Sequence, residues 1–176
     1  TISSMADRLR EEFPEIPIIS IVEAGAKEVC RRGLTEVTVA STVFTAKSGG
    51  YKKEIARLNP DCTVTAVGLP NLAKTVEDGA NPEQVKKEIS ENLDKILLGK
   101  KGNLVLGCTH YPIVADYFKE LYPDVTLIDP AASQARLLKE LLEQDDLINT
   151  NGGNISLNFS GPVGDAQKLL DSIRKK

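Results

Sequence analysis

The chain alternates short apolar runs with longer segments in which apolar residues recur every three to four positions. Six apolar runs, rich in Val, Ile and Leu, predict β-strands at residues 18–22, 36–41, 62–67, 103–106, 125–128 and 154–159. Continuous apolar runs of this kind are expected where both faces of a sheet are buried. Their alternation with helical segments predicts an α/β fold in which helices flank a parallel sheet.

Two of the helical segments have a clear apolar face. These faces consist of Met5, Leu9 and Phe13 in the first segment, and of Val85, Ile89, Leu93 and Leu97 in the second, which covers residues 80–100. Residues at this spacing lie on one side of a helix, so we predict that both faces belong to the core. The charged residues of the longer helix are then solvated. The Asp, Asn and Gly residues over 144–153 predict a loop.

Composition narrows the classes of function. The 176 residues carry a formal net charge of -3 with scattered basic residues, which argues against a nucleic-acid surface and leaves small anionic or zwitterionic ligands. Three cysteines without a CxxC pair, and a single histidine, argue against both a disulfide framework and a metal site. No apolar run is long enough for a membrane span, and the first residues lack the order of a signal peptide. We therefore expect a cytoplasmic protein with free thiols.

Candidate chemistry concentrates over residues 103–118, where a strand runs into a Gly-Cys-Thr-His sequence that contains Cys108 and His110. In open α/β sheets, ligands bind at the carboxyl ends of strands, and a following helix offers free backbone N–H groups. Pro112 suits the first position of that helix. A helix N-terminus lowers a cysteine pKa from about 8.5, so we expect a thiol in Cys108 that exchanges protons near neutral pH, assisted by His110.

The residues alone also allow a structural interpretation of this segment. A cysteine that follows a buried strand is commonly a small core residue, and a lone histidine is often structural. Both interpretations of Cys108 and His110 remain open on spacing alone. Cys30 lies within a helical pattern and Cys62 opens an apolar strand, so we predict that both are core residues.

The sequence LGCTHYP resembles the second-cysteine motif of the glutamate racemase family. Four further segments are similar to that family in order and spacing, namely IPIISIVEAGA, VASTVFTAKSGGY, LPNLAKTVEDG and LIDPAASQARLL. The second of these resembles a Gly-Thr-x-x-Thr-x-x-Ser-Gly-x-Tyr stretch, with Ser41 in place of the glycine. The resemblance spans the chain, although the last two segments depart from the family pattern at one position or more.

The resemblance assigns roles to seven residues. It implies catalytic roles for Cys108 and His110, and substrate-binding roles for Thr1, Thr42, Thr45, Thr109 and Glu77. Ordinary alternatives exist, because threonines near a strand end often cap or turn the chain, and a glutamate at a helix end is often solvated. The implied chemistry uses no cofactor and no metal.

The implied activity is the interconversion of L- and D-glutamate by two opposed thiols, which supplies D-glutamate for peptidoglycan. Aspartate racemases carry Glu at the position of His110, so the resemblance favours glutamate. The family's Asp-Ser-Gly motif and the cysteine of its Cys-Asn-Thr motif are absent, and Thr1 matches the threonine of the latter. The resemblance therefore implies a chain without the N-terminal portion that carries the first catalytic cysteine. A chain without that cysteine is expected not to racemise glutamate alone, and three origins are alternatives: a fragment of an intact enzyme, the product of a disrupted gene, and half of a split protein.

The expected domain organisation follows the same resemblance. Residues 1–22 would be a remnant of a first α/β domain, residues 23–122 a second domain, and residues 123–176 a segment that returns to the first. Such an incomplete domain exposes apolar surface, so we expect a homodimer or pairing with a chain that supplies the missing part. Two other functions are alternatives. One is a non-catalytic interaction module, and the other is a cysteine hydrolase, for which no base and orienting group form a visible motif.

Overall fold

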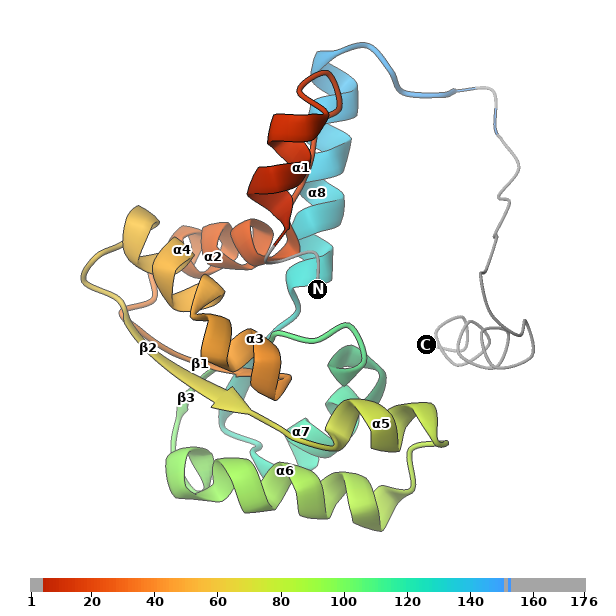
Figure 1. Cartoon of the computed structure of the whole chain (residues 1–176). Coiled ribbons are helices and arrows are strands. Elements are labelled where there is room, and N and C mark those ends of the chain that lie inside the picture. The colour runs from red at the N-terminus through yellow and green to blue at the C-terminus, as the bar shows by residue number, and fades with distance from the viewer. Residues whose placement is uncertain (1–4, 151, 153–176) are drawn as a thin grey trace. The chain divides into compact units, whose positions relative to one another are not determined.

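The computed structural model describes residues 5–150 and 152 and contains a four-stranded parallel sheet (Figure 1). The strands are β1 (Glu36–Ser41), β2 (Thr63–Gly68), β3 (Gly102–Leu106) and β4 (Val125–Ile128), in the order β2-β1-β3-β4. Val39 is aligned with Ala66 on one side and with Val105 on the other, and Val105 is aligned with Ile128. The predicted α/β fold and four of the predicted strands are confirmed. The strand predicted at 154–159 lies outside the described residues.

The prediction of a strand over residues 18–22 is wrong. Ser20 is the N-cap of helix α2 (Ile21–Arg31), so the apolar run ends in the first turn of a helix. From Val22 onwards the buried positions follow a helical period, with Ala26 and Val29 on the same face. A short apolar run has no periodicity of its own, and for this reason the run alone does not distinguish a strand from a helix start.

Helices cover both faces of the sheet and form two apolar cores. One core joins α2 and α4 (Gly50–Leu58) to residues such as Val39 and Val105 of the strands. The other joins α5 (Leu72–Glu77), α6 (Pro82–Leu97) and α7 (Ala115–Leu121) to Ala40, Leu104 and Leu106. Because successive strand residues point to opposite faces, each strand contributes to both cores.

Helix α6 lies within the predicted stretch of 80–100 and buries the face that its pattern predicts. Its four apolar residues at helical spacing, Val85, Ile89, Leu93 and Leu97, are all buried. The side chain of Asn81 accepts hydrogen bonds from the backbone N–H groups of Glu83 (3.1 Å) and Gln84 (3.2 Å), and Pro82 occupies the first turn. The helix is therefore fixed by a capped start and by an apolar face in the core.

The first helix departs from its prediction. In α1 (Ala6–Glu12) and its flanks, the side chains of Met5 and Phe13 are 42% and 43% exposed, so the predicted apolar face is not a core face. The helix is held instead by Arg10, whose guanidinium binds the Glu23 carboxylate at 2.6 and 2.8 Å and the Ile18 carbonyl at 2.8 Å. A polar contact with α2 thus positions α1.

The chain divides into a compact unit of Thr1–Leu138 and a second unit of Lys139–Lys176. Helix α8 (Pro130–Gln144) begins in the first unit and ends in the second. Residues 145–150 contain no helix or strand, which agrees with the loop predicted over 144–153. No helix among the described residues is long and apolar enough to cross a membrane.

Candidate active site

The candidate site lies where β1 and β3 end, on one edge of the sheet. These two strands are neighbours and run parallel, with Ala40 aligned with Leu106. The N–H of Gly107 donates to the Ala40 carbonyl (2.7 Å), which continues the pairing to the last residue before Cys108. Thr42 directly follows β1, so the segments with the predicted chemistry leave the sheet at the same edge.

Cys108, His110 and Glu77 form a continuous chain of contacts. The Cys108 Sγ lies 3.7 Å from His110 Nδ1, and His110 Nε2 lies 2.9 Å from Glu77 Oε1. Glu77 is the last residue of α5, which packs on the 3₁₀ turn η2 (Tyr111–Val114) that follows His110. The imidazole therefore bridges a half-buried thiol and a carboxylate whose side chain is 60% exposed.

The electrostatics of Cys108 differ from expectation. Burial raises the pKa of the Cys108 thiol, and the negative charge of Glu77 raises it further. The backbone N–H groups of His110 and Tyr111 act in the opposite direction and lower that pKa, as expected for groups at a helix start, but burial outweighs them. The predicted depression is thus wrong for this structure. The N-terminal effect is limited because Cys108 is followed by a short 3₁₀ turn, and α7 begins only at Ala115.

Pro112 lies in the first turn of η2, which confirms that a helical segment begins there. The segment is a 3₁₀ turn that leads into an α-helix. Cys62 is buried, in agreement with its predicted place in the core, whereas Cys30 is only partly buried in α2. Burial raises the pKa of both thiols.

Thr42 and Thr45 contact each other. Thr42 is the N-cap of α3 (Val43–Ser48), and its Oγ1 accepts a hydrogen bond from the Thr45 N–H (3.3 Å) and donates one to Thr45 Oγ1 (3.1 Å). These contacts are those of a helix cap, the ordinary alternative for threonines after a strand. Thr109 is exposed at the turn beyond Cys108. Thr1 lies outside the described residues.

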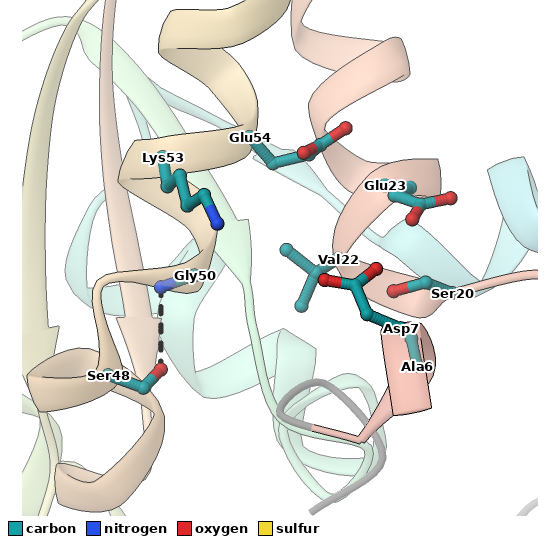
Figure 2. Close-up of a pocket in the computed structure, with 9 residues that line it drawn as sticks. All are labelled: Ala6, Asp7, Ser20, Val22, Glu23, Ser48, Gly50, Lys53 and Glu54. Carbon is teal, nitrogen blue, oxygen red and sulfur yellow. Dashed lines mark hydrogen bonds between the residues drawn. The ribbon is translucent and has the colours of Figure 1, made fainter. Parts of the chain in front are cut away.

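A pocket of about 240 Å³ lies elsewhere in the first unit, between α1, α2 and the start of α4 (Figure 2). Its lining is mostly polar and consists of Ala6, Asp7, Ser20, Val22, Glu23, Ser48, Gly50, Lys53 and Glu54. None of the residues predicted for the site lines it. Over residues 5–150 and 152, no group of three or more His, Cys, Asp or Glu side chains has the arrangement of a metal site.

Comparison with known proteins identifies relatives along the chain. The profile of the family described as Asp/Glu/Hydantoin racemase matches residues 1–138. A glutamate racemase of Aquifex aeolicus is 29% identical over 168 residues, which make up 95% of this chain and 63% of the relative. A second, of Desulforudis audaxviator, is 33% identical over 139 residues, or 77% of this chain and 51% of the relative. The chain thus spans between half and two thirds of these relatives.

The fold is also found in solved structures. The glutamate racemase of Francisella tularensis in complex with D-glutamate superposes with a TM-score of 0.77 at 29% identity, covering 85% of this chain and 58% of that one. The four-stranded parallel sheet and its flanking helices accordingly belong to an architecture that these proteins share over part of their length.

Proposed function

The chain belongs to the Asp/Glu/hydantoin racemase family, and from this premise we propose that it carries one half of the catalytic site of a cofactor-independent glutamate racemase. The observation that carries the proposal is the contact series from Cys108 through His110 to Glu77 at the carboxyl edge of the sheet. In this proposal Cys108 is the acid/base thiol for one face of the substrate.

His110 assists the thiol through its tautomer. When the neutral ring directs its Nε2–H to the Glu77 carboxylate, Nδ1 carries no proton and takes the proton of the Cys108 thiol, which leaves a thiolate beside an imidazolium. The thiolate formed in this way removes the α-proton of glutamate and becomes a thiol. In the reverse direction the same thiol returns a proton to the α-carbon. In this proposal Glu77 acts through the imidazole, in place of the substrate-binding role that the resemblance implies.

Inversion requires a second acid/base group on the opposite face of the α-carbon. One base alone removes the proton but returns it to the same face, so no enantiomer is interconverted. In the family that second thiol belongs to the Cys-Asn-Thr motif, of which Thr1 matches only the threonine. We propose that the complete activity uses sequence beyond the 176 residues, from a longer chain or from a pairing partner.

Glutamate is the proposed substrate. The relatives with the matches given above are glutamate racemases, and the Francisella tularensis protein was crystallised with D-glutamate. The hydroxyls of Thr42, Thr45 and Thr109 are proposed to bind it, together with Thr1. A hydroxyl or a backbone N–H holds a carboxylate without neutralising it permanently.

The proposed domain boundaries are unchanged from the sequence. Residues 23–122 would form one racemase domain, and residues 1–22 and 123–176 would belong to another. Several large apolar side chains of the first unit are exposed, among them Phe13 (43%), Ile16 (50%) and Phe44 (58%). Exposed apolar side chains of this size are consistent with a homodimer or with pairing to a further chain.

The test is exchange of the glutamate α-proton with deuterated solvent, measured for each enantiomer by NMR with this chain. A half-site with one working thiol exchanges one enantiomer faster than the other, and Cys108→Ser abolishes that exchange. Cys62→Ser is the matched control, because Cys62 is a buried core thiol and its loss leaves exchange unchanged.

Racemisation is followed by circular dichroism in the same preparation, and the native mass shows whether a second chain is present. A native mass equal to the 176 residues, with neither racemisation nor exchange, would reject the half-site and favour the alternative of a non-catalytic module with a racemase fold.

A further inference from the structure

We propose that Tyr51 is a positioning residue for Cys108, because its ring fills the space between Gly25 of α2 and Gly107, the residue before the thiol. This inference rests on the proposed function only in assigning the acid/base role to Cys108. The hydrophobic pattern of the sequence assigns no role to Tyr51, although Tyr51 is the last residue of the VASTVFTAKSGGY segment.

The geometry shows a ring enclosed from two sides. A Cβ added at Gly25 would lie 2.9 Å from Tyr51 Cε1, and one added at Gly107 would lie 3.1 Å from Tyr51 Cε2. These two carbons flank the hydroxyl-bearing carbon, so the hydroxyl end of the ring lies between the two glycine backbones. Tyr51 is only 4% exposed and belongs to the core of α2 and α4. The ring therefore has little freedom to move aside.

The Tyr51 ring also restricts the backbone position of Gly107, which precedes the thiol of Cys108. Gly107 is bonded to the Ala40 carbonyl, and an added Cβ there would also lie 3.1 Å from the Ser41 Cβ. The Gly107 backbone is thus held between the end of β1 and the Tyr51 ring. Any shift of that ring is transmitted to the next residue, Cys108.

The charges that act on the Tyr51 phenol are consistent with a position near the Cys108 turn. The charges of Asp129 and Cys108 add to burial in raising the pKa of Tyr51. Asp129 follows β4 and Cys108 follows β3, and both strands end at the same edge of the sheet. The phenol accordingly lies within electrostatic range of the edge that carries the candidate site.

The test measures the alkylation of Cys108 by iodoacetamide as a function of pH, with site-resolved mass spectrometry of the intact chain. Gly25→Ala is the first variant, because its added Cβ would meet Tyr51 Cε1 at 2.9 Å, nearer than the Pro130 side chain at 3.3 Å, and because it leaves the sequence of the Cys108 turn unchanged. Tyr51→Leu removes the ring, and Tyr51→Phe retains it. Gly102→Ala is the matched glycine control in β3, where an added Cβ would meet only Leu97 Cδ2 at 4.0 Å.

If Tyr51 positions the turn, then Gly25→Ala and Tyr51→Leu admit water to a thiol that burial keeps protonated. We expect the rate at pH 7.5 to rise about threefold or more, since the thiolate is the reacting form and its fraction grows tenfold for each unit that the pKa falls. Tyr51→Phe and Gly102→Ala should keep the parent profile. A parent profile in both Gly25→Ala and Tyr51→Leu would overturn the proposal.

Unfolding is recognised separately, because it would also expose Cys62 and accelerate its alkylation. If Gly25→Ala unfolds, Tyr51→Leu alone decides the question, because it keeps Gly25 and adds no Cβ beside Pro130: a parent Cys108 profile in Tyr51→Leu then rejects the proposal. Alkylation uses no glutamate, so the outcome is independent of whether the chain exchanges the α-proton. Failure of the proposed function would leave this result intact, and the reverse also holds.

Discussion

At the scale of single residues, the protonation of Cys108 results from opposed effects. The N–H groups of His110 and Tyr111 favour the thiolate, whereas burial and the carboxylate of Glu77 favour the thiol. Burial is the largest of these effects, so the resting thiol is protonated at neutral pH. In the proposed mechanism His110 accepts that proton, because its Nδ1 lies 3.7 Å from the Cys108 Sγ.

Glu77→Gln tests this balance. Removing a negative charge stabilises the Cys108 thiolate, so the pKa of Cys108 falls and the alkylation rate at pH 7.5 rises. Because Glu77 is well exposed and solvent screens it, we expect an increase of only about twofold. Asp78→Asn is the control, as Asp78 is the adjacent carboxylate and is paired with Lys74 at 2.7 Å. A slower reaction in Glu77→Gln would show that its charge does not disfavour the thiolate.

At the scale of elements, α6 illustrates how local and tertiary signals combine. Its apolar face is buried in the same core as Leu106 and Tyr111, which lie on either side of Cys108 in the sequence. Its start is fixed separately by the Asn81 side chain, which satisfies two backbone N–H groups that no helical carbonyl can reach. The cap therefore contributes to stability without contributing to the core.

Asn81→Ala removes both capping bonds and should lower the free energy of unfolding by about 1 kcal/mol. Urea denaturation followed by far-ultraviolet circular dichroism measures the change, as a lower midpoint with the same slope. Asn81→Asp retains an acceptor at the cap and should keep most of the stability. Equal losses in the two variants would mean that the cap bond is not the source of the effect.

At the scale of the whole molecule, burial acts on many acidic groups in the same direction. It raises the pKa of Cys30, Cys62 and Cys108, and also that of Tyr51 and Tyr111. For each of these groups the neutral form is favoured by folding. Their combined effect is a dependence of stability on alkaline pH.

The sign follows from proton binding. Above a pKa of about 8.5 for an unfolded cysteine, the unfolded chain releases protons that the folded chain retains, so stability is full below that pH and declines above it. We expect the Tm to fall by about 3 °C or more between pH 8 and pH 10. Cys62→Ala, which removes one buried thiol, should reduce the slope. A Tm that is constant over this range would contradict the account.

The sequence by itself determined the parts of this protein that depend on local pattern. The apolar runs located β1 to β4, the helical spacing located α6, and the LGCTHYP motif located the turn with Cys108. Each of these signals lies within a few residues of the feature it predicts. The same signals failed at residues 18–22, where a short apolar run is the same in a strand and at a helix start. They also failed at Met5 and Phe13, where the apolar spacing of an exposed helix face is the same as that of a buried one.

Only the tertiary structure decided the properties that depend on distant segments. The packing of α5 on η2 brings Glu77 to His110, and the packing of α4 on α2 and β2 places Tyr51 beside Gly107. The pKa of Cys108 belongs to the same class, because the water removed from a thiol depends on everything packed around it. An apolar pattern predicts which face of a helix is buried, but the depth at which one thiol lies depends on segments that are distant in the sequence.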